Sequence, residues 1–334
     1  MRNIFFLGLI SFFADIGSQM VYPVIPLYLT YVFGVSTALV GLIEGIAESA
    51  AGLMRVFGGY LSDKFQKKKA LAFSGYLGGV FYKLILLVAG SWVGVLTARV
   101  VDRTGKGIRV APRNALVSES ACDKSLGRAF GLHKTLDMAG AAIGILIAYF
   151  VLREYAGVEQ LRRIFVISII PAVLGLFIFA FIREPKPEKR ELITAKSLIL
   201  GFKTLDKRLR LYLLVVALFT LGSSSNAFLL LKAYEVGYSY SAVILLFFAY
   251  HVSASALSLP LGGLSDKVGR KKLLVSGYFV FSAVYLGFAL AFSRQLIAAM
   301  FILYGAYTAM ITGVERAFIS EIAPPEFRGT GSAG

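Results

Sequence analysis

The chain has 334 residues, of which 57% are hydrophobic and only 16% are charged, and its formal net charge is +16. A soluble domain of ordinary composition carries about 25% charged residues, so the composition excludes a typical soluble protein and indicates a membrane protein. The single cysteine, Cys122, excludes a disulfide framework and a cysteine-based metal cluster. Two distant histidines, His133 and His251, argue against a histidine-rich metal site. We therefore expect no metal and no cofactor.

Long apolar segments follow one another along almost the whole chain. Each has roughly the 20 residues that a helix needs to cross a bilayer. The first continues past Asp15 without a cleavage pattern, so we interpret it as a membrane helix rather than a signal peptide. We predict an all-α polytopic membrane protein with ten membrane helices, near residues 4–31, 37–61, 70–90, 92–118, 127–152, 161–183, 209–231, 241–263, 273–293 and 295–321.

The basic residues lie mainly in alternate short loops, as in 62–69 and 265–272. A strongly basic soluble protein would suggest nucleic-acid binding, but this distribution follows the positive-inside rule of membrane proteins. The exception is 153–163, which is charged on the opposite side. We therefore expect a lipid bilayer and no nucleic acid as partner, a multi-pass protein of the inner (cytoplasmic) membrane, and a cytoplasmic N-terminus.

The sequence repeats itself at an offset of about 203 residues. This offset places Gly59–Lys64 on Gly262–Lys267, Gly34 on Gly237, Ser36 on Ser239, and Arg113 on Arg316. Two homologous halves are typical of transporters built from internal repeats. We predict an N-terminal six-helix bundle (1–183), a cytoplasmic connector (184–208) and a C-terminal bundle (209–334). Because the second half has only four predicted helices, we interpret it as truncated.

The loop after the second predicted helix of each half resembles the signature G-x-L-x-D-x-x-G-R-[KR] of the major facilitator superfamily. The second copy matches fully, with Gly262, Leu264, Asp266, Gly269, Arg270 and Lys271. The first copy has Gln66 for the second glycine and Lys67 for the arginine. Since glycine readily takes a positive φ and glutamine does not, we expect this difference to alter the turn.

Further motifs resemble a prokaryotic drug-efflux-like subgroup of that superfamily with unassigned substrates. They are Asp15–Pro23, Asp102–Ala115, Gly127–Lys134 and Glu315–Ala317. The resemblance implies the major facilitator fold, with two pseudo-symmetric helical bundles of which this chain covers about ten of twelve helices. It also implies alternating access around a cavity lined by helices 1, 4, 7 and 10. Gln19 and Asn114 stand where the subgroup has acids, which puts proton coupling at those positions in doubt. We expect a monomer.

The fourth predicted helix carries five cations, Arg99, Arg103, Lys106, Arg109 and Arg113, at steps of three or four residues. This spacing places them on one helical face, which must meet a wet cavity or be matched by acids. We predict that Arg103, Lys106 and Arg109 bind an anionic group of the substrate. Three neutral residues are also predicted to bind substrate: Gln19, Tyr22 and Tyr307.

Other ionisable residues in the predicted helices are candidates for coupling and gating. For proton coupling we predict Asp15, Glu48, Asp137 and Glu315, and for gating Asp63, Asp266, Arg270, Arg113 and Arg316. The alternative is that these acids and the cations form fixed ion pairs that hold the helices together.

Three functional hypotheses follow. The first is a proton-coupled exporter of a small anionic or zwitterionic solute, with that solute and protons as its partners. The second is multidrug efflux of lipophilic cations, and the third is a membrane sensor on the same fold without transport. An enzyme is not expected, since no nucleophile–base pair, metal-ligand spacing or phosphate loop is found.

Overall fold

The computed structural model describes residues 2–121, 125–152, 158–184, 207–222, 226–291 and 293–322. All regular elements in this part of the chain are helices. They are α1 (Arg2–Val21), α2 (Val24–Leu27), the π-helix η1 (Tyr28–Val32), α3 (Thr37–Phe65), α4 (Lys68–Val88), α5 (Trp92–Glu119), α6 (Leu126–Leu152), α7 (Val158–Ile178), the 3-10 helix η3 (Phe179–Phe181), α9 (Lys207–Gly222), α10 (Asn226–Glu235), α11 (Tyr240–Val268), α12 (Arg270–Ala289) and α13 (Arg294–Ile322).

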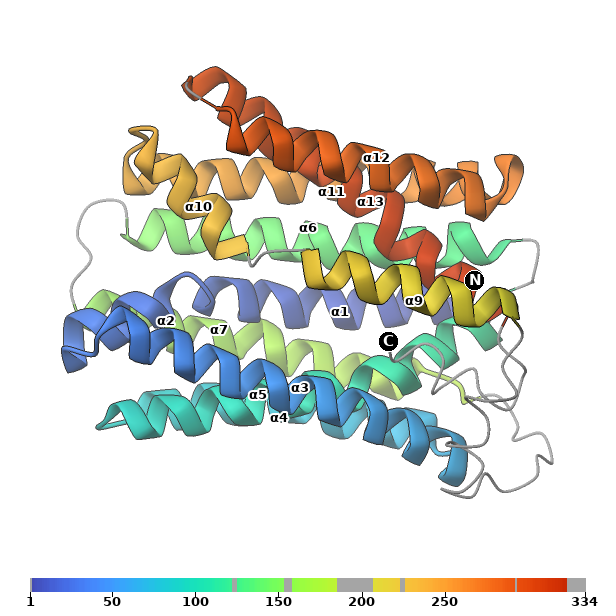
Figure 1. Cartoon of the computed structure of the whole chain (residues 1–334). Coiled ribbons are helices and arrows are strands. Elements are labelled where there is room, and N and C mark those ends of the chain that lie inside the picture. The colour runs from blue at the N-terminus through green and yellow to red at the C-terminus, as the bar shows by residue number, and fades with distance from the viewer. Residues whose placement is uncertain are drawn as a thin grey trace.

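The long helices lie side by side along one common direction (Figure 1). Helix α6 is central, because it packs along α1 on one side and along α11 on the other. Helix α7 packs against α1, α4 against α7 and α5, and α3 against α5, while α11 packs against α13, and α13 against α12. The connection between the two groups therefore runs through α6 and its contacts with α11 and α13.

The first predicted membrane helix is interrupted in the structure. It ends as α1 at Val21 and resumes as α2 at Val24, after a turn at Tyr22 and Pro23. Proline has no backbone N–H and its ring clashes with the preceding helical turn, so a break at this position is expected physically. The predicted helix over 209–231 corresponds to α9 and α10, which lie on either side of residues 223–225, outside the described part of the chain.

The sequence repeat is visible in matched helix starts. Helices α3 and α11 both have 29 residues. Ser36 caps α3 by accepting a hydrogen bond from the N–H of Leu39 at 3.3 Å, and Ser239 caps α11 in the same way through Ala242 at 3.4 Å. A serine hydroxyl at this position satisfies an N–H that has no partner within the helix.

The two signature loops differ at the positions where their sequences differ, as expected. Gln66 ends α3 in the left-handed conformation (φ 54°, ψ 13°), and Lys67 follows before α4 begins. Gly269 has φ 102° and ψ 130°, a combination open mainly to glycine, and α12 begins at the next residue. In both loops the capping N–H donates to a serine carbonyl at 3.1 Å, that of Ser62 or Ser265. Glycine therefore permits a loop that is one residue shorter.

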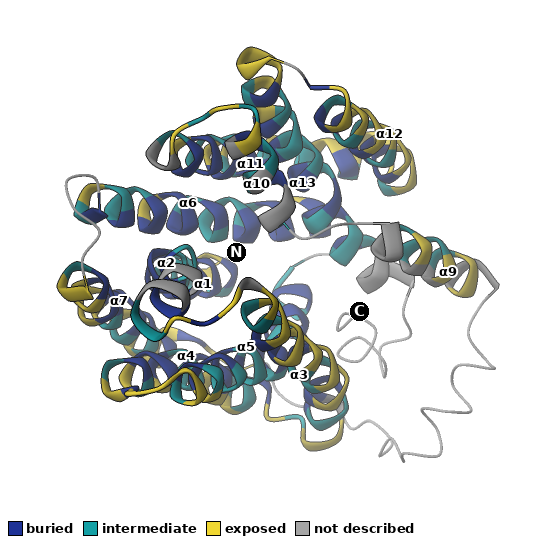
Figure 2. Cartoon of the chain, turned by 60° about the vertical axis from the view of Figure 1, so that its left-hand side comes forward, coloured by how far each residue is buried: buried dark blue, intermediate teal, exposed yellow. Residues whose placement is uncertain are grey.

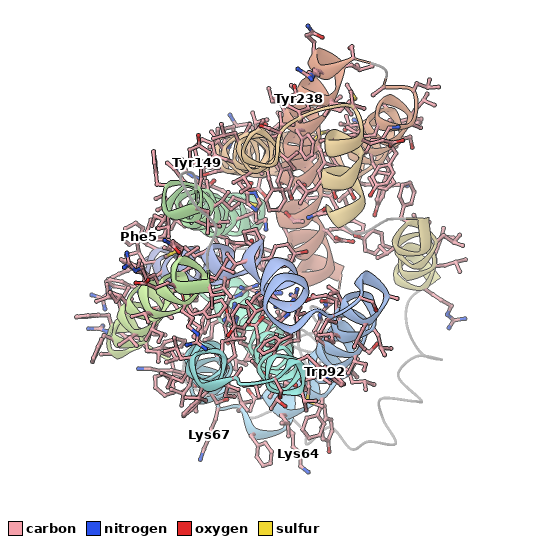
Figure 3. All side chains as sticks on the ribbon, turned by 90° about the vertical axis from the view of Figure 1, so that its left-hand side faces the viewer. Phe5, Lys64, Lys67, Trp92, Tyr149 and Tyr238 are labelled. Carbon is pink, nitrogen blue, oxygen red and sulfur yellow. The ribbon has the colours of Figure 1, made fainter. Side chains whose placement is uncertain are left out.

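Much of the outer surface is apolar. Seven helices in the described part, α1, α4, α6, α7 with η3, α11, α12 and α13, are long and apolar enough to cross a membrane by length and composition. Exposed residues gather on the outward faces of the helices (Figure 2), and they include Phe177 (70% exposed) and Phe279 (74%). Lys64 and Lys67 point away from the bundle at its periphery (Figure 3). A lipid environment accounts for exposed phenylalanines that water would disfavour.

Candidate functional site

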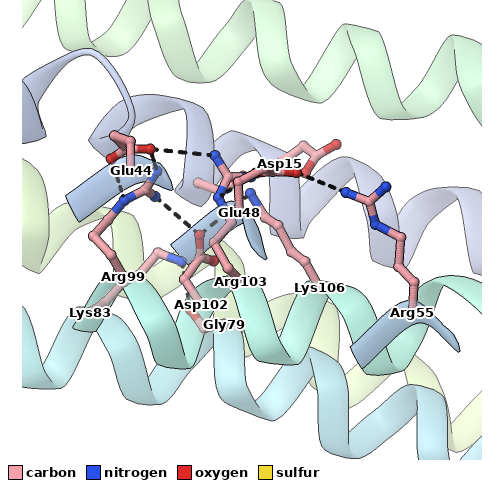
Figure 4. Close-up of polar contacts among 11 residues, drawn as sticks. Asp15, Glu44, Glu48, Arg55, Gly79, Lys83, Arg99, Asp102, Arg103 and Lys106 are labelled. Atoms are coloured by element: carbon pink, nitrogen blue, oxygen red, sulfur yellow. Dashed lines mark hydrogen bonds and ion pairs between the residues drawn. The ribbon is translucent and has the colours of Figure 1, made fainter. Parts of the chain in front are cut away.

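The best-defined charged cluster lies between α3 and α5 (Figure 4). Arg99 of α5 meets the Glu44 carboxylate of α3 with two hydrogen bonds, one from Nε to Oε1 at 2.7 Å and one from Nη2 to Oε2. Its Nη1 also donates to Asp102 at 3.3 Å. The Arg99 and Asp102 side chains are each 3% exposed. The Glu44 side chain is 31% exposed. The bidentate Arg99–Glu44 contact therefore joins α3 and α5 at a partly buried position.

Two cations on the next turns of α5 are held more loosely. Arg103 lies 3.4 Å from Glu48 and 4.0 Å from Glu44, while Lys106 lies 3.7 Å from Asp102. These separations exceed those of a charged hydrogen bond, which are about 2.7–2.9 Å. The side chains of Arg103 and Lys106 are 17% and 23% exposed. Both cations are therefore held less firmly by their acids than Arg99 is.

The last two cations of the series face other helices. The Arg109 guanidinium lies 4.0 Å from the ring centre of Tyr76 on α4, a cation–π contact. Arg113 donates to Ser11 of α1 at 3.5 Å, and the Ser11 hydroxyl is also 2.6 Å from the Tyr76 hydroxyl and 3.0 Å from His133 Nε2 on α6. Both arginines are buried. These contacts favour a packing role over direct substrate contact, while the predicted roles of Arg109 in binding and Arg113 in gating stay predictions.

The four predicted proton carriers are distributed over three places. Glu48 is half exposed and also bonds Arg55 at 2.8 Å. Asp15 of α1 accepts from Ser18 at 3.2 Å, and its carboxyl group lies close enough to that of Asp137 on α6 for the two to interact electrostatically. Asp137 is also paired with Lys134 at 2.9 Å. The fourth, Glu315 of α13, accepts from the Tyr212 hydroxyl at 2.9 Å, in the other half of the molecule. The structure thus brings together only Asp15 and Asp137.

The neutral residues predicted for substrate binding are also separated. The Tyr22 ring centre lies 6.0 Å from the Arg99 guanidinium, beside the charged cluster. Gln19 lies on α1, about one turn before Tyr22, and its Oε1 is buried without a hydrogen bond to any described residue. Tyr307 stacks instead with Tyr304 on α13, at 5.6 Å between ring centres. Their common role in binding stays a prediction.

Two of the residues predicted for gating, Asp266 and Arg270, lie together at one end of the bundle. We call this the basal end, defined by Asn3, Lys68, Glu119, Gly127 and Asp266 at the starts of α1, α4 and α6 and the ends of α5 and α11. Here the Asp266 carboxylate accepts from the N–H groups of Gly127 and Arg128, both at 2.9 Å, and from Arg270 at 3.0 Å.

Glycines make this contact between α6 and α11 close. A Cβ on Gly127 would lie 2.5 Å from the Gly262 carbonyl oxygen, and one on Gly131 would lie 2.6 Å from that of Ser258.

The other residues predicted for gating lie elsewhere or are only partly described. Arg316 of α13 interacts electrostatically with Arg113 and Asp137. The backbone of Asp63 is at the end of α3, but its side chain lies outside the described residues.

Two charged features were missed in the sequence. Lys83 of α4 is 1% exposed and donates to the Gly79 carbonyl at 2.7 Å. With Asp102 and Lys106 it lines a cavity of about 10 Å³, the space of roughly one water molecule. Lys68 and Glu119 form a mostly buried ion pair at 2.5 Å. Lys83 stands in an apolar segment, and that signal alone makes an intramembrane lysine a functional candidate. No described group of His, Cys, Asp and Glu side chains could hold a metal ion.

Comparisons with known proteins identify the family to which this helical bundle and its repeated loop belong. The sequence profile of the Major Facilitator Superfamily matches residues 7–333. The chain belongs to this superfamily. It is 35% identical to an uncharacterised MFS-type transporter of Methanocaldococcus jannaschii, over 98% of this chain and 82% of that protein. It is 24% identical to the multidrug resistance protein MdtH of Proteus mirabilis, over 98% of this chain and 80% of that protein.

The fold agrees with that of solved major facilitator proteins. The structure of the human organic anion transporter MFSD10 superposes with a TM-score of 0.74 at 15% identity, over 99% of this chain and 88% of that one. The predicted fold class is thereby confirmed: the chain is a multi-pass, all-helical membrane protein of the major facilitator type. Members of this superfamily are membrane transporters, so the charged cluster of α3 and α5 lies in a transporter.

Proposed function

We propose that this major facilitator protein is a secondary active transporter that exports a small organic solute with an anionic or zwitterionic group. It works by alternating access, rocking the two halves about the α6–α11 contact. The single observation that supports this substrate class is the loose hold on Arg103 and Lys106, at 3.4–4.0 Å from their acids. A substrate carboxylate or phosphate can replace those partners and meet arginine with two parallel hydrogen bonds.

The orientation follows from the loops. The basic signature loops are at the ends of α3 and α11, and we place these ends, with the N-terminus, in the cytoplasm. The membrane is the inner membrane of the cell. In this orientation the hydrogen bonds from the Gly127 and Arg128 N–H groups to the Asp266 carboxylate act as a latch that closes the cytoplasmic side.

Replacing Arg103 by alanine is expected to abolish stabilisation by organic anions. A ligand that binds only the folded protein stabilises it by about 2.7 kcal/mol at 100 times its Kd, so its binding is measurable as a shift in melting temperature in detergent. Wild type should be stabilised by aromatic or aliphatic carboxylates, and Arg103→Ala should not. The matched control is Arg55→Ala, because Arg55 contacts the same Glu48 at 2.8 Å but from α3. An anion-induced shift that survives in Arg103→Ala would remove the α5 cations from the binding site.

Proton coupling is assigned to Asp15 within its pair with Asp137. Two neighbouring carboxylates repel each other when both are ionised, so we expect Asp15 and Asp137, whose carboxyl groups interact electrostatically, to hold one proton between them. Asp137 is the better candidate for the charged partner, since Lys134 is paired with it. Asp15 then holds a proton that can be released when the helices move.

Asp15→Asn is expected to uncouple transport from the pH gradient. In proteoliposomes, an imposed pH gradient should accelerate substrate movement by wild type above leakage, and should have no effect on the variant. Glu159→Gln serves as the control, because Glu159 is 74% exposed and paired only with its neighbour Arg163 among described residues. A pH-gradient response that persists in Asp15→Asn would exclude Asp15 as the proton carrier.

A second candidate function is efflux of lipophilic cations. It is supported by the multidrug resistance relative and by stacked aromatic residues on α11 and α13, where Tyr304 lies 5.1 Å from Tyr250 and 5.6 Å from Tyr307. Aromatic faces attract organic cations. In the thermal-shift measurement, stabilisation by lipophilic cations that is lost in Tyr307→Ala and kept in Arg103→Ala would favour this function over the first.

A further inference from the structure

A groove opens at the basal end between the start of α6 and the end of α11. It encloses about 530 Å³, within the range of ligand sites. Ser125, which precedes α6, and Arg128 of α6 form one wall, and the last two turns of α11 form the other. None of the residues assigned to substrate binding or proton coupling lines this groove.

The α11 wall is apolar toward the middle of the helix. Pro260, Gly263 and Leu264 occupy successive turns of one helical face, which ends at Lys267. Pro260 and Leu264 are exposed, and no atom lies within 4 Å of the position that a Cβ on Gly263 would occupy. The α11 wall of the groove is therefore an open apolar strip, and it runs along a helix that is able to span the membrane.

The mouth of the groove is positively charged. Arg128 and Lys267 are both exposed, and neither forms an ion pair with a carboxylate among the described residues. Asp266 also lines the groove, but its carboxylate is already bound by the N–H groups of Gly127 and Arg128 and by Arg270. The acid is therefore neutralised within the fold, and the two cations remain available for an external anion.

We propose that this groove binds one anionic phospholipid. Its phosphate lies between Arg128 and Lys267, and one acyl chain follows the strip formed by Pro260, Gly263 and Leu264. A phospholipid is the occupant because it carries a phosphate directly above a hydrocarbon chain, the same order in which α11 places Lys267 above its apolar residues. Basic residues at the ends of membrane helices attract anionic lipids. The inference does not depend on which solute the protein transports.

The test uses the full chain, delipidated in detergent, with lipid binding followed by native mass spectrometry. Wild type is titrated with phosphatidylglycerol and, in parallel, with phosphatidylcholine. Each cation near an anionic lipid contributes about fivefold to binding, so the first phosphatidylglycerol should bind about thirtyfold more weakly to the double variant Arg128→Gln, Lys267→Gln. The control double variant Lys271→Gln, Lys272→Gln removes the same charge from exposed positions on α12 that do not line the groove, and its first lipid should bind as to wild type.

A second variant tests the apolar strip without changing any charge. Gly263→Phe fills the groove at a position where the side chain meets no atom, so the protein should fold normally and bind the first phosphatidylglycerol at least about tenfold more weakly. Equal weakening by the groove and control double variants would reduce the effect to general surface charge and overturn the proposal. So would unchanged binding in Gly263→Phe, or displacement of the lipid by water-soluble glycerol phosphate at equal concentration, which would indicate a simple phosphate site.

Discussion

Replacing Arg99 by methionine is expected to lower the free energy of unfolding by about 3–5 kcal/mol. The change keeps the side-chain volume but removes the cation that holds Glu44 and Asp102. Asp102 is then left with Lys106 at 3.7 Å in a place that is 3% exposed. Breaking a buried pair by removing one partner has a cost of this size because the other charge stays buried. Unfolding in mixed detergent micelles, monitored by circular dichroism, measures the difference.

Arg55→Met provides the matched control. Arg55 also forms an arginine–glutamate pair between membrane helix residues, but its side chain is 39% exposed and that of Glu48 is 54% exposed. An exposed pair contributes below about 1 kcal/mol. The additional change Glu44→Gln should restore part of the stability lost in Arg99→Met, since it removes one of the uncompensated charges. Equal stability of Arg99→Met and Arg55→Met would contradict a structural role of the Glu44–Arg99–Asp102 cluster.

Replacing Asp266 by alanine is expected to open the basal end of the bundle. The change removes the acceptor of two backbone N–H groups of α6 and the partner of Arg270. Hydrogen bonds to charged groups contribute roughly 1.5–3 kcal/mol each. If the closed form loses about 3 kcal/mol of this hydrogen-bond energy, the equilibrium between closed and open forms shifts toward the open form by roughly 100-fold. Spin labels on Lys64→Cys and Lys271→Cys, with Cys122 replaced by serine, report this opening as a longer distance between α3 and α12 in pulsed EPR.

The conservative variant Asp266→Asn separates charge from hydrogen bonding. Its amide oxygen can still accept from one N–H of α6, so the population of the longer distance should lie between those of wild type and Asp266→Ala. Glu235→Ala, which removes an exposed acid from the end of α10, should leave the distance distribution unchanged. Identical distributions for wild type and Asp266→Ala would show that Asp266 is no latch.

The helices and their order could be predicted because their signals are local. Apolar segments of sufficient length marked the spans, and the repeat at Ser36 and Ser239 marked two helix starts that the structure confirms. The interruption at Pro23 was missed, since membrane helices often tolerate proline when neighbouring groups satisfy the backbone. Nothing in the local sequence shows whether such neighbours exist.

The partners of the charged residues could be predicted only in part. Periodicity places Arg99, Arg103 and Arg109 on one face of a helix, but a face of α5 borders both α3 and α4. Long side chains can reach in either direction, so Arg99 turns to Glu44 while Arg109 covers Tyr76. To predict which neighbour each side chain contacts, one must know how α3, α4 and α5 are rotated about their axes and how far apart they lie. Residue spacing along α5 alone does not give this information.

The ion pairs between α3 and α5 have a consequence for how the protein is made. Neither helix is among the seven that are apolar enough to cross a membrane by themselves. An unpaired arginine in a bilayer is unfavourable by at least about 2.5 kcal/mol, and α5 carries Arg99, Arg103, Arg109 and Arg113 together with Lys106. Helix α5 should therefore leave the translocon only after α3 has brought Glu44 and Glu48 into the membrane. Membrane insertion of the first half would then be cooperative, because α5 depends on acids that α3 carries two spans earlier in the chain.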